Sequence, residues 1–326
     1  MKSTENTISN NASGVLAQVA SRARVSAGTV SRVFNNSSLI PAGTRARVLC
    51  AARELGFRPR VGVRNKQIAL ITEPPHKTKM GGYVNTLTQY ICYALSKADA
   101  GITMITEDRL GNLSDCWFDG IIGIAWEQKT LDVLKNIHNI PIIWFSDNLA
   151  DSFHTIYFDP VATGRMAGKY FIEKGHRKLA VIHEQDYCGT ERANGFAAAM
   201  TDAGLDISSN LLRISNTTQP HLAVKQLLDA ACTGVWVTGE DLKVLEISWL
   251  LQELAGRRIP EDISIMGFEN PGISEFMRPS LTTIFCPLQE MAERAVGLVL
   301  RDEFPEELYK IELPVTLIER NSVRNI

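Results

Sequence analysis

Residues 23–60, ARVSAGTVSRVFNNSSLIPAGTRARVLCAARELGFRPR, decide how the first part of this 326-residue chain folds. Apolar residues recur there at helical spacing in three short segments. Ser26 stands where its hydroxyl can cap the second helix, and Gly56 ends the third. The three predicted helices cover about 15–23, 26–34 and 41–55. Short helices joined by a tight turn predict a helix-turn-helix unit, whose second helix can lie in a DNA major groove.

Charge is divided unevenly along the chain. Residues 1–66 carry eleven Lys and Arg against two acids, a net charge of +9, which leaves −11 on the remaining residues. A compact basic unit joined to an acidic body is typical of proteins that bind nucleic acid. The charge pattern therefore supports the helix-turn-helix interpretation.

Composition excludes several classes of protein. The chain is 45% apolar, as in ordinary globular proteins, and has no run of 18 apolar residues. Residues 1–13 are polar, which does not fit a secretory signal and predicts a disordered arm. The six cysteines are scattered without a C-x-x-C pair, so we expect neither a disulfide framework nor a zinc site. We expect reduced, buried thiols at Cys50, Cys92 and Cys232, and a cytoplasmic protein associated with the nucleoid.

From Ile68 onward, near-continuous apolar runs alternate with helical patterns. Such runs are typical of parallel strands that are buried on both faces, and the alternation predicts a doubly wound α/β body. The predicted strands are 67–72, 102–106, 120–125, 140–145, 154–158, 178–183, 234–238 and 262–268. The predicted helices are 83–99, 159–175, 189–204, 219–232 and 241–256.

The first part of the chain resembles the head of the LacI/GalR family of transcription regulators. The matching motifs follow one another in order: V-S-x-x-T-V-S-R-V-x-N-N from Val25, T-R-x-R-V from Thr44, and A-A-x-E-L-G-F-x-P from Ala51. The resemblance implies a recognition helix at 26–34 and phosphate contacts around Asn35, Thr44 and Arg45. The expected DNA-binding residues are Ser26, Ala27, Gly28, Thr29, Ser31, Arg32, Asn35, Asn36, Thr44, Arg45, Arg60 and Arg64.

Three features of the head depart from the family pattern. Ala27 and Gly28 occupy the usual base-reading positions but offer no side-chain hydrogen bond, so base readout would depend more on Arg32, Ser31 and Thr29. Arg24 stands where the turn usually has glycine. The hinge is only about residues 59–66 and has no leucine to wedge into the minor groove, where Val61 or Val63 could substitute.

The body resembles the periplasmic-binding-protein-like regulatory unit of the same family. The matching segments are D-G-I-I at 119–122, residues 159–181, R-A-N-G-F at 192–196, residues 257–284 and L-P-V-T-L-I-E-R-N-S at 313–322. The resemblance implies an all-α head at 14–58 and a two-lobed parallel α/β body at 67–326 that binds the effector and dimerises. Lobe 1 would comprise about 67–158 and 287–312, and lobe 2 about 159–286 and 313–326.

Ligands bind such sheets at the carboxyl ends of parallel strands, so we expect the effector between the lobes. The resemblance matches Arg192 and Glu269 to ligand-holding positions, although each could instead form a surface salt bridge. The usual acid after the 140–145 strand falls on Ser146, with Asp147 next to it, and Gly239–Glu240 replaces a usual N-D pair. Trp126 and Trp144 end strands, where either could stack on a ring or belong to the core. The expected ligand residues are Trp126, Ser146, Asp147, Arg192, Gly239 and Glu269.

Two further local features matter. Only about 13 residues separate the 102–106 and 120–125 strands, too few for a full crossover helix, which leaves open a regulator without small-molecule control. Asp159 is expected to cap the following helix, and His176 to act as a cation at a helix end.

Two other classes of protein fit the sequence less well than a transcription regulator. An enzyme fused to a DNA reader would need a catalytic set, and the chain has no G-x-S-x-G, P-loop or H-E-x-x-H and no metal spacing among its histidines. A periplasmic solute-binding protein would need a signal peptide and no basic head. We therefore predict a repressor, not an enzyme, without a cofactor or metal. It would bind a double-stranded DNA operator as a homodimer, under control of a sugar-like or purine-like molecule.

Overall fold

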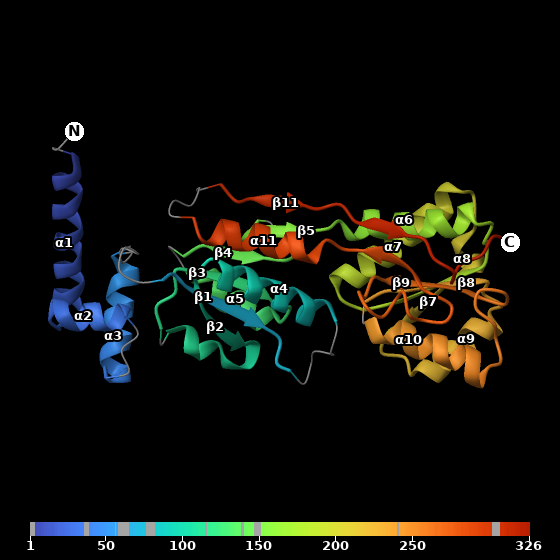
Figure 1. Ribbon diagram of the computed structural model, residues 1–326, viewed down its shortest axis with the longest axis horizontal. Coiled ribbons are helices and arrows are strands. Elements are labelled where there is room, and N and C mark those ends of the chain that lie inside the picture. Colours follow the sequence, from blue (N-terminus) through green and yellow to red (C-terminus); the bar gives the residue numbers. More distant parts are fainter. Residues whose placement is uncertain are drawn as a thin grey trace.

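The computed structural model describes residues 4–35, 39–55, 57, 65–75, 82–114, 116–137, 140–146, 151–239, 241–301 and 307–326. Three parts follow one another along the long axis: a helical head, a first α/β lobe and a second α/β lobe (Figure 1). The parallel α/β body and the helical head are the fold class that the sequence predicts.

The head consists of α1 (Thr4–Ala23), α2 (Ala27–Phe34) and α3 (Ala42–Glu54). Residues 4–13, expected as part of a disordered arm, continue α1 instead, which runs away from the rest of the head in Figure 1. This segment contains neither proline nor glycine, so nothing in it stops the helix. Val30 and Val33 are buried against Val48 and Leu49, and this apolar cluster holds α2 on α3.

The turn between α1 and α2 has the predicted cap and an unusual backbone. Ser26 Oγ accepts a hydrogen bond of 3.1 Å from the Thr29 amide, which confirms Ser26 as the N-cap of α2. Arg24 has φ of 55°, in the left-handed region that normally costs an L-residue about 1–2 kcal/mol. The position where the family has glycine therefore keeps a glycine-like conformation although it carries a side chain.

Lobe 1 is a parallel sheet of six strands in the order β11-β5-β4-β3-β1-β2. α4 and α11 cover one face, and η1 and α5 cover the other. The elements are β1 (Gln67–Thr72), α4 (Tyr83–Lys97), β2 (Gly101–Thr106), η1 (Glu107–Ser114), β3 (Gly120–Ile124), α5 (Gln128–Lys135), β4 (Ile142–Trp144), β5 (His154–Tyr157), α11 (Leu288–Val299) and β11 (Lys310–Glu312).

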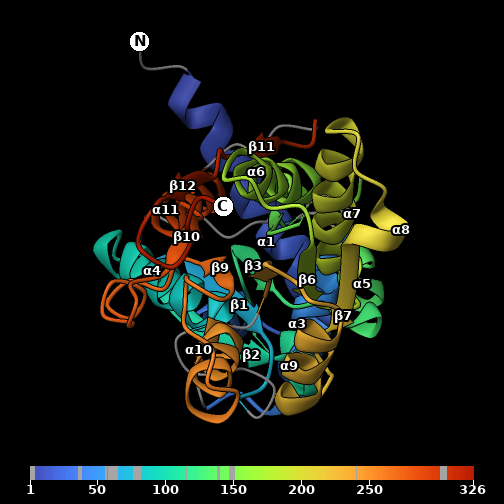
Figure 2. The same ribbon diagram turned by 90° about the vertical axis from the view of Figure 1, so that its right-hand side faces the viewer.

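Lobe 2 repeats this plan with the order β12-β10-β9-β8-β6-β7, in which only the β10–β12 pair is antiparallel. α6 and α7 pack on one face, and α9 and α10 on the other (Figure 2). The elements are α6 (Pro160–Glu173), β6 (Leu179–His183), α7 (Tyr187–Asp202), α8 (Ile207–Asn210), β7 (Leu211–Ser215), α9 (Pro220–Asp229), β8 (Gly234–Val237), α10 (Asp241–Trp249), η3 (Leu250–Leu254), β9 (Ser264–Phe268), β10 (Thr282–Phe285) and β12 (Thr316–Ile318).

The chain passes between the lobes three times. It crosses after β5, returns after β10, and crosses again between β11 and β12. Asp159 lies at the first crossing, where its Oδ1 accepts hydrogen bonds from the Val161 and Ala162 amides at 2.8 and 3.0 Å. This geometry confirms Asp159 as the cap of α6.

The short connection between β2 and β3 folds as predicted, without a full crossover helix. It forms the eight-residue 3₁₀ helix η1, which is kinked at Arg109. Glu107 begins it, buried, with Oε1 accepting hydrogen bonds from the Glu127 amide at 2.8 Å and from Thr130 Oγ1 at 3.1 Å. These bonds fix the start of η1 against α5.

Burial decides between the two alternatives for Trp144 and corrects the expectations for Cys50 and His176. Trp144 is 1% exposed and stacks on Phe153 with ring centroids 5.8 Å apart, so it belongs to the core. Cys50 is exposed, because it lies on the outer side of α3. His176, expected to act as a cation at a helix end, is buried.

His176 is 1% exposed, with Nδ1 2.9 Å from Thr233 Oγ1 and Nε2 donating to the Arg324 carbonyl at 3.1 Å. Burial is the main cause that lowers its pKa, so the ring is uncharged near neutral pH. The expected helix-end cation is therefore wrong, since the C-terminal segment packs over the imidazole.

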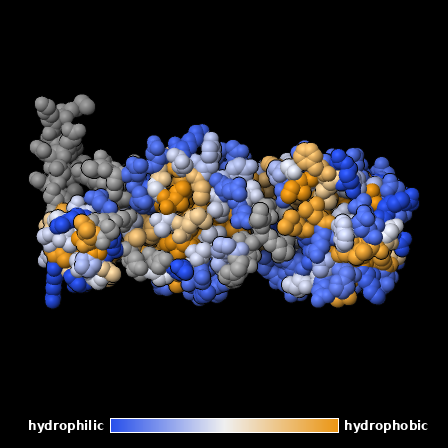
Figure 3. All heavy atoms as spheres, turned by 60° about the horizontal axis from the view of Figure 1, so that its bottom comes forward, coloured by the Kyte–Doolittle hydropathy of each residue, from blue (hydrophilic) through white to orange (hydrophobic). Residues whose placement is uncertain are grey.

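The described residues contain no helix that is long and apolar enough to cross a membrane, and no group of acidic, His or Cys side chains that could hold a metal ion. Figure 3 shows that hydrophilic residues separate several apolar patches on one face of both lobes.

We expect Arg24→Gly to stabilise the head by up to about 1 kcal/mol, because glycine adopts a positive φ without the steric cost. Native-state hydrogen exchange of the α2 and α3 amides in the full chain would measure this gain. Arg24→Ala is the matched control, since it removes the charge but keeps Cβ. An equal gain in both variants would contradict the backbone explanation.

We expect His176 to make lobe 2 less stable as the pH falls. The folded pKa lies below the ordinary value of 6.5, so below that pH the unfolded chain binds a proton that the folded chain does not. Relative to His176→Gln, the native chain should lose up to about 1.4 kcal/mol of unfolding free energy per pH unit. Urea denaturation of both proteins between pH 5 and 7.5 measures the difference, and a pH-independent difference would refute it.

Candidate functional site

One face of α2 is exposed and carries most of the DNA-binding residues expected from the sequence. Ala27, Ser31 and Asn35 lie one helical turn apart, with Gly28 and Arg32 beside them, and all five are exposed. The opposite face of the helix is buried in the head. The sequence therefore presents one continuous face of small and polar groups that can approach base edges.

The remaining expected DNA-binding residues surround this face. Arg32 Nε donates to the Gly28 carbonyl at 3.2 Å, which lays the guanidinium along the helix. Thr29 Oγ1 is 2.9 Å from Ser26 Oγ, and Thr44 and Arg45 are half-buried at the start of α3. Three expected residues lie outside the part of the chain that the structure describes: Asn36, Arg60 and Arg64.

A cavity of about 510 Å³ lies between the two lobes. Its volume is in the range of small-molecule sites. Of the six ligand residues expected from the sequence, Asp147 lies outside the described residues. The other five line the cavity: Trp126, Ser146, Arg192, Gly239 and Glu269.

Arg192 is the central polar group of the cavity. Its guanidinium carbon lies 4.9 Å from the centroid of the Phe268 ring and 5.6 Å from that of Phe158. NH1 is 3.9 Å from Glu184 Oε2, while Nε is buried and has no hydrogen-bond partner among the described residues. Burial alone would lower the pKa of Arg192, but Glu184 and other nearby acidic groups raise it, so the side chain stays charged.

The R-A-N-G-F motif explains how Arg192 comes to this position. Gly195 allows α7 to approach α6, since a Cβ there would lie 2.1 Å from the Val161 carbonyl oxygen. Phe196 is fully buried and stacks on Trp236 at 5.8 Å. These two residues fix α7 on the lobe, so that its first turns carry Arg192 to the cavity.

Glu184 is an acid of the cavity that the sequence reasoning missed. Thr238 donates to Glu184 Oε2 at 2.9 Å. Gly239 has φ of 82°, and a Cβ there would lie 0.8 Å from Glu184 Oε1. Gly239 therefore makes room for this carboxylate, which follows β6 directly and could have been found from its place at a strand end.

Glu269 lines the cavity, but its carboxylate already has partners. Arg320 donates to both oxygens, at 2.7 and 2.8 Å, and Thr283 also donates to Oε2. The Arg320 side chain comes from the end of the C-terminal strand region, far away in sequence. Glu269 therefore joins this strand region to β9 as well as facing the cavity.

Aromatic rings form much of the cavity wall. The ring centroid of Tyr83 lies 6.3 Å from those of both Trp126 and Phe158, in edge-on contacts. Burial raises the pKa of the Tyr83 hydroxyl. Phe158 and Phe268 are 6.4 Å apart on the two lobes. The sequence reasoning selected only Trp126 of these rings, because the other aromatic residues follow ordinary apolar strand or helix patterns.

Family models match two parts of the chain. Residues 15–60 match the bacterial regulatory proteins of the lacI family, and residues 169–323 match a periplasmic-binding-protein-like domain. The HTH-type transcriptional repressor PurR of Serratia proteamaculans (strain 568) is 29% identical over 335 residues, covering 94% of this chain and 95% of that protein.

Solved structures agree over nearly the whole length. The transcriptional regulator CelR in complex with cellobiose is 25% identical, with a TM-score of 0.68, covering 94% of this chain and 99% of that one. A lac repressor dimer bound to operator and the anti-inducer ONPF has the same fold, at 20% identity and a TM-score of 0.67, covering 94% and 98%. With a lacI-type head, a periplasmic-binding-protein-like body and these relatives, the chain belongs to the LacI/GalR family of transcription regulators.

Proposed function

We propose that this protein is a repressor of transcription whose affinity for DNA is controlled by a small molecule bound between its lobes. The observation that carries this proposal is the cavity, where Arg192 presents a buried Nε without a hydrogen-bond partner among the described residues. A buried donor without an acceptor destabilises the folded protein unless a ligand or a water molecule accepts its hydrogen bond. The exposed face of α2 supplies the DNA-reading surface in the same chain.

The cavity favours an uncharged ligand of the sugar class. Its positive group, Arg192, already lies 3.9 Å from Glu184, so the pair offers donors and acceptors to hydroxyls rather than a net charge to an anion. Trp126, 37% exposed, and the neighbouring rings offer flat faces for a sugar ring. The solved CelR relative contains cellobiose, and a purine is the second candidate, since the same rings could stack on its planar base.

Dimerisation through the body completes the proposal. A repressor with one recognition helix per chain reads a two-fold operator when two heads stand side by side, as the lac repressor dimer does. The protein would act in the cytoplasm at the nucleoid. A regulator without small-molecule control is the weaker alternative, because the cavity is present and contains the charged side chains of Arg192 and Glu184 despite the short η1 connection.

We expect a thermal-shift screen of the full chain against neutral sugars, sugar phosphates and purines to identify the effector class. A ligand at 100 times its dissociation constant should add about 2.7 kcal/mol to the free energy of unfolding. Arg192→Ala should abolish that shift and the DNA response to the ligand while leaving ligand-free DNA binding unchanged. Lys225→Ala, an exposed change in lobe 2, is the control. A normal ligand response in Arg192→Ala would refute this binding site.

We expect Arg32→Ala to weaken binding to the selected operator by about 1–3 kcal/mol, or roughly 5- to 150-fold, because the guanidinium is the longest donor on the exposed face of α2. Enrichment of double-stranded DNA from a random pool gives the operator, and fluorescence anisotropy gives the affinity. Arg32→Lys keeps the charge and should lose specific binding but retain binding to unrelated DNA. Equal losses on both DNAs would remove Arg32 from base readout.

A further inference from the structure

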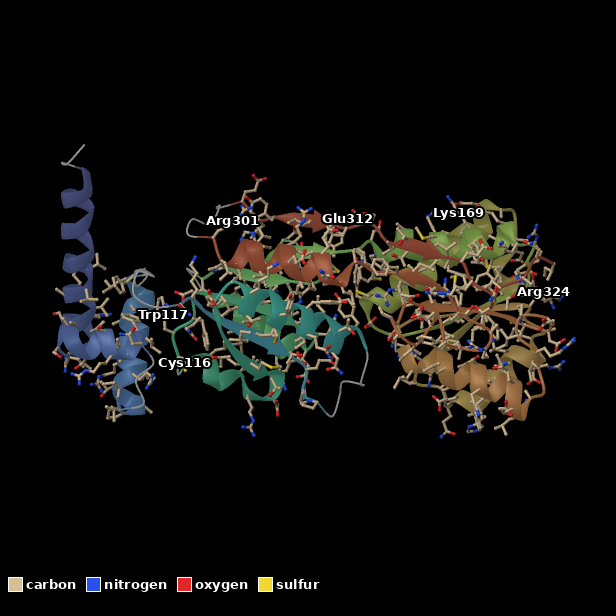
Figure 4. The ribbon with its side chains drawn as sticks, in the orientation of Figure 1. Cys116, Trp117, Lys169, Arg301, Glu312 and Arg324 are labelled. Carbon is tan, nitrogen blue, oxygen red and sulfur yellow. The ribbon has the colours of Figure 1, made fainter. Side chains whose placement is uncertain are left out.

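Trp117 belongs to lobe 1 by sequence, in the loop between η1 and β3, but its side chain is buried in the head. It is 4% exposed and is part of the apolar cluster formed by α1, α2 and α3. Its ring meets the edge of Phe34 with centroids 5.0 Å apart, and Phe34 in turn lies 5.4 Å from Phe57. Figure 4 labels Trp117 and Cys116 at the end of lobe 1 nearest to α3.

The same residue is tied firmly to its own lobe. Trp117 Nε1 donates to Asp119 Oδ1 at 3.2 Å. Asp119 Oδ2 accepts from the Gln67 amide, and the Asp119 amide donates to the Gln67 carbonyl, both at 2.7 Å. Asp119 therefore connects the indole to Gln67, the first residue of β1, and the indole in turn joins this lobe to the head.

The position of Phe34 makes this contact relevant to DNA. Phe34 is the last residue of α2, the helix whose opposite face carries the expected base readers. Ala27, Gly28, Ser31 and Arg32 remain exposed while Trp117 is in place. The docked head thus keeps its reading face open to DNA.

We propose that Trp117 is a positioning residue for DNA recognition, and that it holds the recognition helix α2 at a fixed place on lobe 1. This inference rests on the proposed DNA binding. The segment 59–66 has only eight residues with which to hold the head in place. The proposal gives this role to a side chain of the body. Among the described residues of the apolar head cluster, Trp117 is the one that the body supplies.

A single strand, β3, connects the loop that contacts the head with the wall of the ligand cavity. Trp117 precedes β3, and Trp126, which lines the cavity, follows it. β3 lies inside the sheet between β1 and β4, and it is buried throughout. A shift of the cavity wall would therefore be passed along β3 to the residue that holds α2.

The test compares three versions of the full chain by amide NMR and by operator affinity. A Gly-Gly insertion between Trp117 and Phe118 leaves the indole in the head but loosens its connection to the lobe. We expect the head signals to stay dispersed and to sharpen, because the head then tumbles independently, and operator affinity to fall about tenfold or more. Trp117→Ala should do the same, and Trp117→Phe should preserve most of both properties.

A Gly-Gly insertion between Ala203 and Gly204, both exposed in a turn of lobe 2, is the matched control and should change neither readout. Unchanged line widths and affinity in the insertion at Trp117 would overturn the proposal. Loss of head dispersion in Trp117→Ala alone, with a normal insertion variant, would show that Trp117 only stabilises the head fold. If the native chain selects no DNA, the proposed function fails, while the line widths still decide whether Trp117 holds the head.

Discussion

Parallel pairing of buried strands is the constraint on which the rest of the body depends. Parallel neighbours need a crossover on a sheet face, so the strands of each lobe, apart from β12, point the same way and their carboxyl ends come to the same edge. The cavity is lined by residues that lie one or two positions after such ends: Glu73, Trp126, Ser146, Phe158, Glu184, Gly239, Glu269 and Cys286. Each of these strand ends contributes at least one residue, so substitutions at these positions can change the chemistry of the cavity while the two sheets remain the same.

The polar interior of the cavity shows how this freedom is used. The segment after β8 offers Gly239, and the acid stands instead on Glu184 after β6, inside the space that the missing Cβ leaves. Glu184 then lies beside Arg192, which rests between two phenylalanine rings. The strand ends after β6 and β8 thus contribute to one site, since both meet at the same edge of the sheet.

The connection between head and body follows a similar logic. The link between β2 and β3 is shortened to η1, and the loop after it sends Trp117 into the head instead of closing on its own lobe. The buried indole and the hydrogen bonds of Asp119 turn this loop into a joint between the two units. Arg24, held at positive φ in the turn before α2, shows that the head tolerates local strain where its own core fixes the backbone.

The sequence by itself determined the class of the fold, the extent of most central strands and the capping of α2 and α6, because each of these depends on local patterns. It also gave five cavity residues, from strand ends and from motifs shared with the family. It did not reveal β7 and β10, whose short or mixed patterns become strands only by pairing with neighbours. Tertiary structure alone decided that His176 is buried, that Trp144 is core, that Arg320 holds Glu269, and that Trp117 leaves its lobe for the head. The contacts of Arg320 with Glu269 and of His176 with Arg324 join residues 51 and 148 positions apart, and no local pattern encodes which distant side chain will fill a given space.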